Sequence, residues 1–162
     1  MTEERSHSLR PATSADVDAV SALVERAYGH YVERIGMRPG PMTEDYAEVI
    51  RNKRVTVAER DGAIVGLLVL DIDDEGFVVD NVAVDPAVRG TGLGRTLLEL
   101  AEAEARRAGF DSIYLYNHDE MIENIDLYGR IGYIEYDRRS CGDFALVFMR
   151  KPLRDQPANA PA

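Results

Sequence analysis

The feature that most constrains this chain is the stretch from Val82 to Leu98, VAVDPAVRGTGLGRTLL. It begins with a β-type run, and Asp85-Pro86 ends that run because proline cannot donate a hydrogen bond to a neighbouring strand. A glycine-rich loop follows, and the residues from Arg95 onward favour a helix. Glycines at a helix start let free backbone N–H groups approach a ligand, and the positive end of the helix dipole favours anions. The sequence therefore predicts a pyrophosphate-binding loop.

The glycine spacing distinguishes between kinds of phosphate loop. Gly90 and Gly94 enclose three residues and precede Arg95, whereas a P-loop has four residues between its glycines and then a lysine. A dinucleotide-binding loop needs G-x-G-x-x-G after a first strand, and this pattern is G-x-G-x-G in mid-chain. Arg89, Gly92 and Gly94 fit Arg/Gln-x-x-Gly-x-Gly/Ala instead. With VAVDP before it, this pattern closely resembles the acetyl-CoA signature of the GNAT superfamily of N-acetyltransferases. The alternative is an ordinary glycine-rich turn before a surface helix.

Length and composition are those of a globular protein. The 162 residues are 45% hydrophobic and 30% charged, which suits one domain. We expect that domain over residues 8–152, with a flexible leader over 1–7 and a disordered tail over 153–162. No apolar run reaches about 18 residues, so no transmembrane helix is expected. The first ten residues, MTEERSHSLR, have no apolar core of the kind a secretory signal needs, so none is expected. The single cysteine, Cys141, permits a reducing compartment, and we expect a cytoplasmic protein.

The formal net charge of −10 and the sequence pI near 4.8 limit the classes of partner. A sequence-independent nucleic-acid binder needs a basic face, so we expect no nucleic acid and no membrane as partner. An acidic field is compatible with a cationic amine as substrate, although acidity also serves solubility alone. His7, His30 and His118 form no Cys/His cluster, so we expect no metal.

The apolar patterning predicts an α/β fold with a mixed sheet. Alternating and β-branched runs indicate strands, whereas apolar residues at helical spacing indicate helices. The expected strands are Ser8–Arg10, Val55–Glu59, Ala63–Ile72, Phe77–Val84, Ser112–Tyr116, Tyr133–Asp137 and Asp143–Arg150; the expected helices are one that starts at Thr13–Asp16 and runs to Tyr28, a short one containing Tyr46–Ile50, Gly94–Ala108 and Met121–Ile131. An antiparallel meander thus precedes a parallel β-α-β unit, because a helix connects the two strands of that unit.

Local signals set the expected helix ends and loops. Thr13 is followed three residues later by Asp16, which predicts a capped helix start. Thr43 is expected to cap the second helix. Glycines and prolines predict irregular structure over Gly29–Thr43, and Asn117–Glu120 is expected to be a loop.

A second motif extends the resemblance from about Ser8 to Pro152. Asn124 with Leu127–Tyr133 is similar to the family pattern N-x-x-x-x-Y-x-x-x-G-F/Y, with one residue fewer between Asn and Tyr. The resemblance implies a GNAT-like fold in which the two strands that flank the phosphate-loop helix splay apart. Pantetheine would then pair with the main chain near Val82 and Val84, whose side chains we expect in the core.

Acetyl transfer to an amine requires a placed thioester, an acceptor for the amine proton and a proton for the departing thiolate. The resemblance implies that Tyr128 lies near the coenzyme sulfur and supplies that proton; the alternative is a tyrosine packed at a helix edge. Asn117 and Asn124 could bind the pantetheine amides, or Asn117 could satisfy a turn.

The base is expected to be Asp80, because Asp80 and Asn81 interrupt an apolar run and a buried acid is costly unless it is paired or serves a cavity. The alternative is that Asp80 pairs with a cation or with backbone. Glu33, Glu44 and Asp45 are lesser candidates, and His30 and His118 are expected to be exposed loop residues.

Acceptor recognition is assigned to the segment between the first two helices. Tyr28, Tyr31, Met42 and Tyr46 gather where glycines and prolines prevent one long helix, and aromatic side chains can hold an apolar or cationic amine. The alternative is a hydrophobic lid packed on the first helix.

The predicted function is transfer of an acetyl group from acetyl-CoA to a primary amine, by direct attack in a ternary complex. The acceptor amine could belong to a small molecule, a peptide or a protein, and the oligomeric state is open between monomer and homodimer. A non-catalytic coenzyme-A-binding regulatory module is the alternative. The predicted coenzyme-binding residues are Val82, Val84, Arg89, Gly90, Thr91, Gly92, Leu93, Gly94, Arg95, Thr96, Asn117, Asn124 and Tyr128.

Overall fold

The computed structural model describes residues 7–153. The predicted leader and tail fall outside these residues except at His7 and Leu153. Leu153, which the sequence assigned to the tail, is buried, and its N–H donates to the carbonyl oxygen of Asp111 at 2.8 Å. No helix within the described residues has the length and apolar content needed to cross a membrane.

The described residues form five α-helices, three short 3-10 helices and seven strands. In chain order these are β1 (Ser8–Pro11), η1 (Ser14–Asp16), α1 (Val17–Tyr28), α2 (Tyr31–Ile35), η2 (Gly40–Thr43), α3 (Tyr46–Asn52), β2 (Arg54–Arg60), β3 (Ala63–Asp73), β4 (Gly76–Val84), η3 (Pro86–Val88), α4 (Leu93–Arg107), β5 (Ser112–His118), α5 (Ile122–Arg130), β6 (Ile134–Cys141) and β7 (Phe144–Pro152). The expected order of strands and long helices is confirmed, with α2 added.

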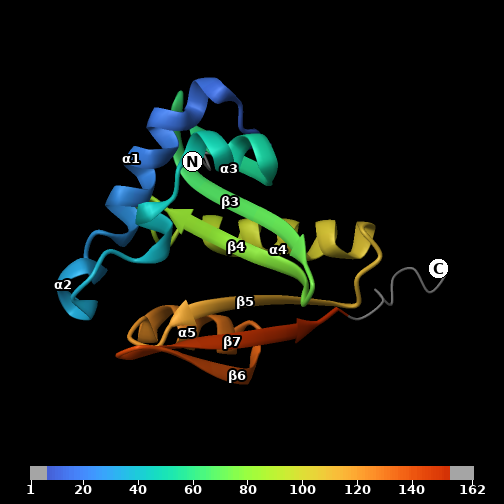
Figure 1. Cartoon of the computed structure of the whole chain (residues 1–162). Coiled ribbons are helices and arrows are strands. Elements are labelled where there is room, and N and C mark those ends of the chain that lie inside the picture. Colours follow the sequence, from blue (N-terminus) through green and yellow to red (C-terminus); the bar gives the residue numbers. More distant parts are fainter. Residues whose placement is uncertain (1–6, 154–162) are drawn as a thin grey trace. The chain divides into compact units, whose positions relative to one another are not determined.

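The strands make one mixed sheet with the order β1-β2-β3-β4-β5-β7-β6 (Figure 1). Strands β1, β2 and β3 pair antiparallel, as do β5, β7 and β6. Strands β4 and β5 pair in parallel at Phe77–Ile113 and Val78–Tyr114. The mixed α/β fold class predicted from the sequence is therefore confirmed. The chain divides into two compact units, which within the described residues are 7–71 with 79–101, and 72–78 with 102–153.

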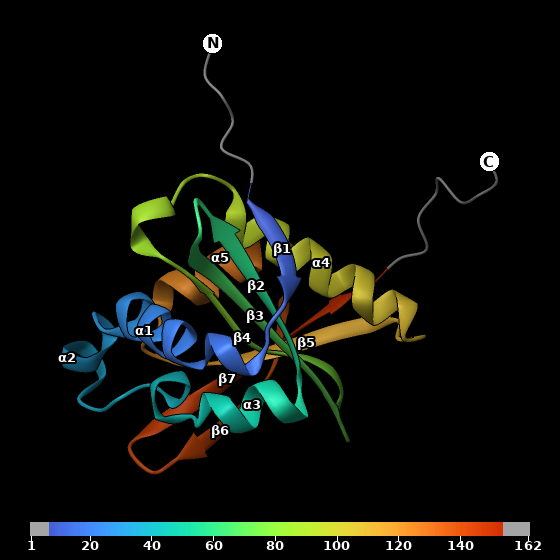
Figure 2. The same ribbon diagram turned by 90° about the horizontal axis from the view of Figure 1, so that it is seen from above.

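In the first unit, helices cover strands β2 and β3 from both sides (Figure 2). Helix α1 buries an apolar stripe that includes Val20, Leu23 and Val24. On the other side the start of α4 lies so close that a Cβ at Gly66 would stand 2.9 Å from Leu93 Cδ2. A side chain at this position of β3 would have to displace Leu93 or the methyl group of Ala58, which would lie 3.1 Å from the Cβ.

Helix starts in the first unit show one prediction confirmed and one corrected. Thr13 and Asp16 form the expected capping box at η1. The cap of α3, however, is Asp45, whose Oδ1 accepts from the N–H groups of Ala47 at 3.0 Å and Glu48 at 3.4 Å. Thr43 instead closes a 3-10 turn, because its hydroxyl donates to the carbonyl of Gly40 at 2.8 Å.

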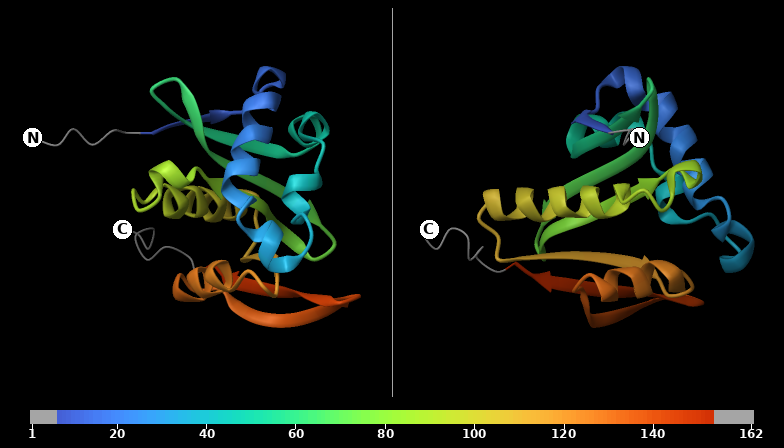
Figure 3. Two further views of the ribbon diagram at one scale, coloured as in Figure 1. Left: turned by 90° about the vertical axis from the view of Figure 1, so that its left-hand side faces the viewer. Right: turned by 180° about the vertical axis from the view of Figure 1, so that it is seen from behind.

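In the second unit, α5 lies along strands β5, β7 and β6 (Figure 3). Val78, Tyr114 and Phe148 form a buried cluster there. Strand β5 continues through Asn117 and His118, where the sequence predicted a loop, because both residues pair with β7. His118 is buried and stacks on Phe144 at 4.4 Å between ring centroids, so its expected exposure is wrong.

Strand β6 is the last strand of the sheet, and each of its eight residues is exposed. Its pairing with β7 shifts register between Glu135 and Asp137. The β6–β7 turn contains Gly142 at φ 69°, a conformation that glycine adopts without strain.

Candidate functional site

The predicted phosphate loop connects β4 to α4 in the first unit. Asp85 begins it: its N–H donates to the carbonyl of Val65 at 2.9 Å, and its Oδ1 accepts from the Ala87 N–H at 2.9 Å. The other carboxylate oxygen accepts from Arg26 Nε of α1 at 3.0 Å. The Asp-Pro signal therefore marks a turn that is fixed to both a strand and a helix.

The structure explains the three glycines of the loop in two ways: backbone conformation for two of them, and open space beside the helix for the third. Gly90 and Gly92 have φ angles of 81° and 86°, which side chains rarely adopt. Gly94 has no such angle, and a Cβ there would meet only Val84 Cγ2 at 3.7 Å, an ordinary contact. The fold itself therefore does not require a glycine at position 94. The absence of a side chain there keeps open the approach to the first turn of α4.

The loop presents polar groups to solvent at the start of a 15-residue helix. Arg89, Thr91, Arg95 and Thr96 are exposed. The Thr91 hydroxyl donates to the carbonyl of Val88 at 2.7 Å, and the Thr96 hydroxyl donates to that of Gly92 at 3.1 Å. Two guanidinium groups beside a helix N-terminus can bind the phosphates of a nucleotide. Leu93 is buried, so only its main chain can take part.

The strand that leads into the loop departs from the prediction at its valines. Val82 and Val84 are half-buried, and the buried residues between and before them are Ala83 and Asn81. The expectation that the two valine side chains belong to the core is therefore wrong. The carbonyl of Val82 accepts from the Tyr28 hydroxyl at 3.0 Å.

Asp80 pairs with a lysine. Its Oδ2 accepts from Lys53 Nζ at 2.8 Å, and Asp71 Oδ2 lies 3.7 Å from the same nitrogen. Burial alone would lower the pKa of Lys53, but the hydrogen bond from Lys53 to Asp80 and the charges of the nearby carboxylates outweigh it and raise that pKa. This ion pair with a cation is the alternative to a catalytic base that the sequence left open for Asp80.

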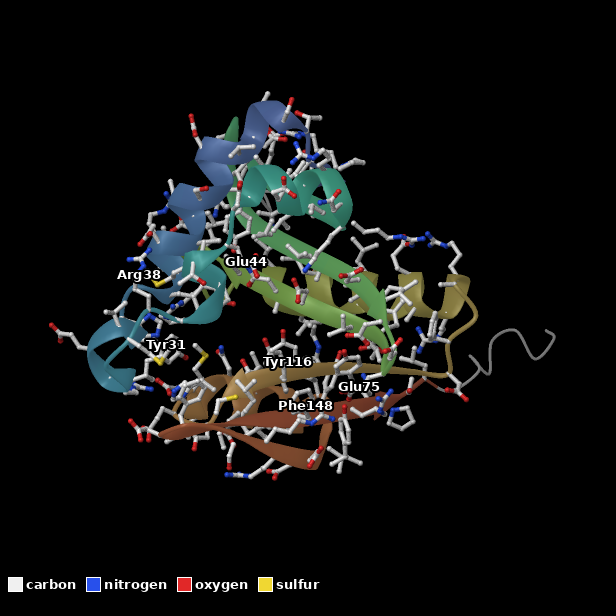
Figure 4. All side chains as sticks on the ribbon, viewed as in Figure 1. Tyr31, Arg38, Glu44, Glu75, Tyr116 and Phe148 are labelled. Carbon is white, nitrogen blue, oxygen red and sulfur yellow. The ribbon has the colours of Figure 1, made fainter. Side chains whose placement is uncertain are left out.

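The residues assigned to acceptor recognition are mostly buried. Tyr28, Tyr31 and Tyr46 are 8%, 3% and 4% exposed, and Met42 is half-buried. Arg38 of the same segment donates to the carbonyl of Met42 at 3.1 Å; Tyr31 and Arg38 are labelled in Figure 4. Their burial agrees with the hydrophobic lid considered as the alternative from the sequence, although Tyr28 is itself the last residue of α1.

Asn81 is the residue whose part sequence reasoning missed. Its Oδ1 accepts from the Tyr28 hydroxyl at 2.7 Å, and its Nδ2 donates to the Tyr46 hydroxyl at 3.1 Å. Burial is the main cause that raises the pKa of Tyr46, so this phenol stays protonated. The signal was present as a polar residue in an apolar run, but the sequence did not show its partners.

The second unit holds the predicted acid and the two asparagines. Tyr128 is buried on α5, and its ring meets that of Tyr133 edge-on at 5.8 Å between centroids. The Tyr133 hydroxyl is buried without a hydrogen-bond partner among residues 7–153. Asn117 on β5 and Asn124 on α5 are half-buried. The predicted site residues are therefore divided, with the phosphate loop, Asp80 and the lid in one unit and these three residues in the other.

An exposed aromatic surface in the second unit was not predicted. Tyr116 and Tyr136 are 40% and 42% exposed, and both rings contact Phe148, at 5.1 Å and 6.2 Å between centroids. Arg139 covers the Phe148 ring at 3.8 Å, and Figure 4 labels Tyr116 and Phe148 on neighbouring strands. Only the pairing of β5, β7 and β6 brings these residues together.

Known proteins resemble this chain over most of its length. An IAA acetyltransferase from Azospirillum brasilense is 38% identical over 106 residues, which are 62% of this chain and 68% of that protein. The ribosomal-protein-S18-alanine N-acetyltransferase from Escherichia coli superposes with a TM-score of 0.73 at 20% identity, covering 95% of this chain and 98% of the other.

A GNAT family acetyltransferase from Elizabethkingia anophelis with acetyl-CoA bound superposes with a TM-score of 0.70 at 17% identity, covering 91% of this chain and 98% of that one. Residues 18–133 match the acetyltransferase (GNAT) family. That range includes the glycine loop at the start of α4 and the Asn124–Tyr133 motif. The chain is therefore an acyltransferase that belongs to the GNAT family of acetyltransferases.

Proposed function

We propose that this acetyltransferase binds acetyl-CoA at the loop between β4 and α4 and transfers the acetyl group to a primary amine. The observation that carries the proposal is Gly94: the fold has room for a side chain at this position, and the absence of one leaves the helix N-terminus open to a phosphate. The exposed guanidinium groups of Arg89 and Arg95 support the same ligand. Relatives with acetyl-CoA bound share the fold.

The proposed reaction is a direct attack in a ternary complex. The amine nitrogen forms a bond to the thioester carbonyl carbon, and the carbon–sulfur bond of the tetrahedral intermediate then breaks. The leaving thiolate takes a proton from the Tyr128 phenol, and the amine proton passes to a base, for which Asp80 is the candidate. Main-chain N–H groups near Val82 and Val84 would bind the pantetheine arm and polarise the carbonyl. Asn117 and Asn124 would bind its amides.

The test is turnover with a panel of acceptors. Purified protein is incubated with acetyl-CoA and either small primary amines or peptides with a free N-terminus, and free thiol and acetylated product are measured. The peptides include an N-terminal alanine, because an alanine N-acetyltransferase shares the fold. We expect thiol release that depends on an amine and matches product in amount. Coenzyme binding without turnover on any acceptor would favour the regulatory module instead.

A further inference from the structure

A buried hydrogen-bond network connects three distant segments of the first unit through Asn81. Asn81 is 7% exposed. Its oxygen accepts from Tyr28 at the end of α1, and its nitrogen donates to Tyr46 at the start of α3. The Tyr46 hydroxyl in turn donates to the carbonyl of Pro41 at 2.6 Å. We name these four residues, with Val82, the Asn81 network.

The positions of the protons fix the direction of this network. Tyr46 uses its only hydroxyl proton on Pro41, so it must accept from the Asn81 NH2 group. The amide oxygen is then turned toward Tyr28. The Tyr28 hydroxyl proton lies between two acceptors, Asn81 Oδ1 at 2.7 Å and the Val82 carbonyl at 3.0 Å. Each tyrosine therefore also binds one main-chain carbonyl outside the amide.

These two carbonyls belong to the segments that the proposed reaction uses. Pro41 lies in η2, between α2 and α3, where the acceptor is expected. Val82 lies on β4, three residues before Asp85 begins the phosphate loop. An apolar residue would fill a buried position at lower cost, since a buried amide must find partners. In return for this cost, the hydrogen bonds of the Asn81 amide fix the position of one segment relative to the other.

We propose that Asn81 is a positioning residue that holds the acceptor-side segment 40–46 and the coenzyme-binding main chain of β4 in one arrangement. Tyr46 connects Asn81 to the carbonyl of Pro41, and we call this connection the acceptor arm. Tyr28 connects Asn81 to the carbonyl of Val82, and we call this the coenzyme arm. The proposal rests on the proposed function, and it replaces direct contact with substrate as the role of Tyr28 and Tyr46.

Each arm can be broken separately by a Tyr→Phe substitution, which removes the hydroxyl group and keeps the aromatic ring. Tyr46→Phe removes the donor to Pro41, and we expect it to raise the acceptor KM at least tenfold while the acetyl-CoA KM changes less than threefold. Tyr28→Phe removes the donor to Val82, and we expect the opposite split, with a matching rise in the acetyl-CoA dissociation constant measured by calorimetry. Asn81→Leu should raise both constants.

Tyr114→Phe is the matched control. It also deletes a tyrosine hydroxyl that donates a hydrogen bond, to Asp73, but it lies outside the network and outside segment 40–46, so both constants should stay within twofold. In the Asn81→Leu background, each tyrosine substitution should have a smaller effect than in the wild type, because the part that depends on the amide is already lost. If Asn81→Leu does not fold, the two Tyr→Phe variants and their double variant carry the test.

The outcomes separate this proposal from the proposed function. Lower melting temperatures with both KM values unchanged would show a merely structural network and overturn the proposal while acetyl transfer stands. The proposal would also be overturned if each tyrosine variant changed the acceptor KM and the acetyl-CoA KM by the same factor. A wild-type protein that acetylates no amine would overturn the proposed function. The coenzyme arm would then still be judged by calorimetry, and an unchanged dissociation constant in Tyr28→Phe would refute it.

Discussion

Gly94 is the single residue at which the proposed ligand can be tested with least disturbance of the fold. Because a Cβ there would meet one ordinary contact, Gly94→Ala should fold with an unchanged melting temperature. We expect its affinity for acetyl-CoA to fall at least tenfold, since the methyl group stands where the phosphate must approach. Calorimetry measures the change.

Gly40→Ala is the control for this substitution, because Gly40 also has open space and no positive φ. It should leave coenzyme affinity unchanged. Affinity retained in Gly94→Ala would place the coenzyme elsewhere. Gly92→Ala tests less, because the positive φ of Gly92 makes any loss of binding inseparable from backbone strain.

Tyr128 carries the proposed proton for the thiolate. Tyr128→Phe should keep coenzyme binding and lower kcat by about 10²–10⁴-fold. The matched control is Tyr133→Phe, whose ring contacts that of Tyr128 and whose hydroxyl has no partner among the described residues. Loss of that hydroxyl should leave kcat unchanged. Unchanged turnover in Tyr128→Phe would make this residue a packing element of α5.

The pH–rate profile tests whether Asp80 is the base. Asp80→Asn should abolish the limb that rises toward alkaline pH, because no proton acceptor remains. Lys53→Met is the matched control: it removes the ammonium 2.8 Å from the carboxylate and so breaks the same ion pair, but it leaves the proposed proton acceptor in place, so the limb should remain. A limb retained at the same pH in both variants assigns the pair to the structure of the unit.

At the scale of the elements, the order of strands and helices could be predicted from the sequence. The spacing of apolar residues and the positions of glycine and proline are properties of short segments, so no distant partner is needed to interpret them. The errors have two causes: a choice between neighbouring residues for the helix cap, and pairing with a strand distant in sequence. Thr43 has the chemistry of a cap, but its hydroxyl binds Gly40 and Asp45 caps α3. Strand β5 gains Asn117 and His118 from pairing with β7, against their weak strand propensity.

Asp16 links two elements, and its ion pair makes the fold sensitive to acid. The hydrogen bonds from Arg10 of β1 lower the pKa of Asp16 to about 2, in spite of burial. A carboxyl whose pKa is lowered in the folded state stabilises it above the ordinary pKa, and this contribution is lost as pH falls from about 4 to about 2.

Asp16→Asn should therefore lower the free energy of unfolding at pH 7 by about 1–2 kcal/mol and flatten its decline between pH 4 and pH 2. Urea unfolding at several pH values measures this. Glu99→Gln is the control, because Glu99 and Arg95 are both exposed at 4.0 Å and such pairs contribute little. An equal loss in both variants would contradict the argument.

At the scale of the whole molecule, the coenzyme should stabilise the fold. A ligand that binds only the native state at a hundredfold excess over its dissociation constant adds about 2.7 kcal/mol. Thermal unfolding with acetyl-CoA should show a higher melting temperature, and ATP at the same concentration should not reproduce it. Equal shifts with both nucleotides would indicate a general phosphate site.

The candidate site was predictable to the extent that it is local. The proposed phosphate loop lies within eight residues, Arg89–Thr96, so its glycine spacing could be read directly from the sequence. The roles of Asp80 and Tyr46 depend on Lys53 and Asn81, which are 27 and 35 residues away in sequence. A polar residue in an apolar run indicates that it has a hydrogen-bond or ion-pair partner, but it does not indicate which residue that partner is.

The exposed strand at the edge of the sheet bears on how this protein behaves at high concentration. An unpaired strand edge can recruit the edge of another copy and start aggregation. Strand β6 carries Ile134 and Tyr136 in the open, but four charged residues, Glu135, Asp137, Arg138 and Arg139, stand among them. The register shift between Glu135 and Asp137 also interrupts a flat edge. Substitutions that neutralise these four charges should therefore promote association of folded copies through this edge of the sheet.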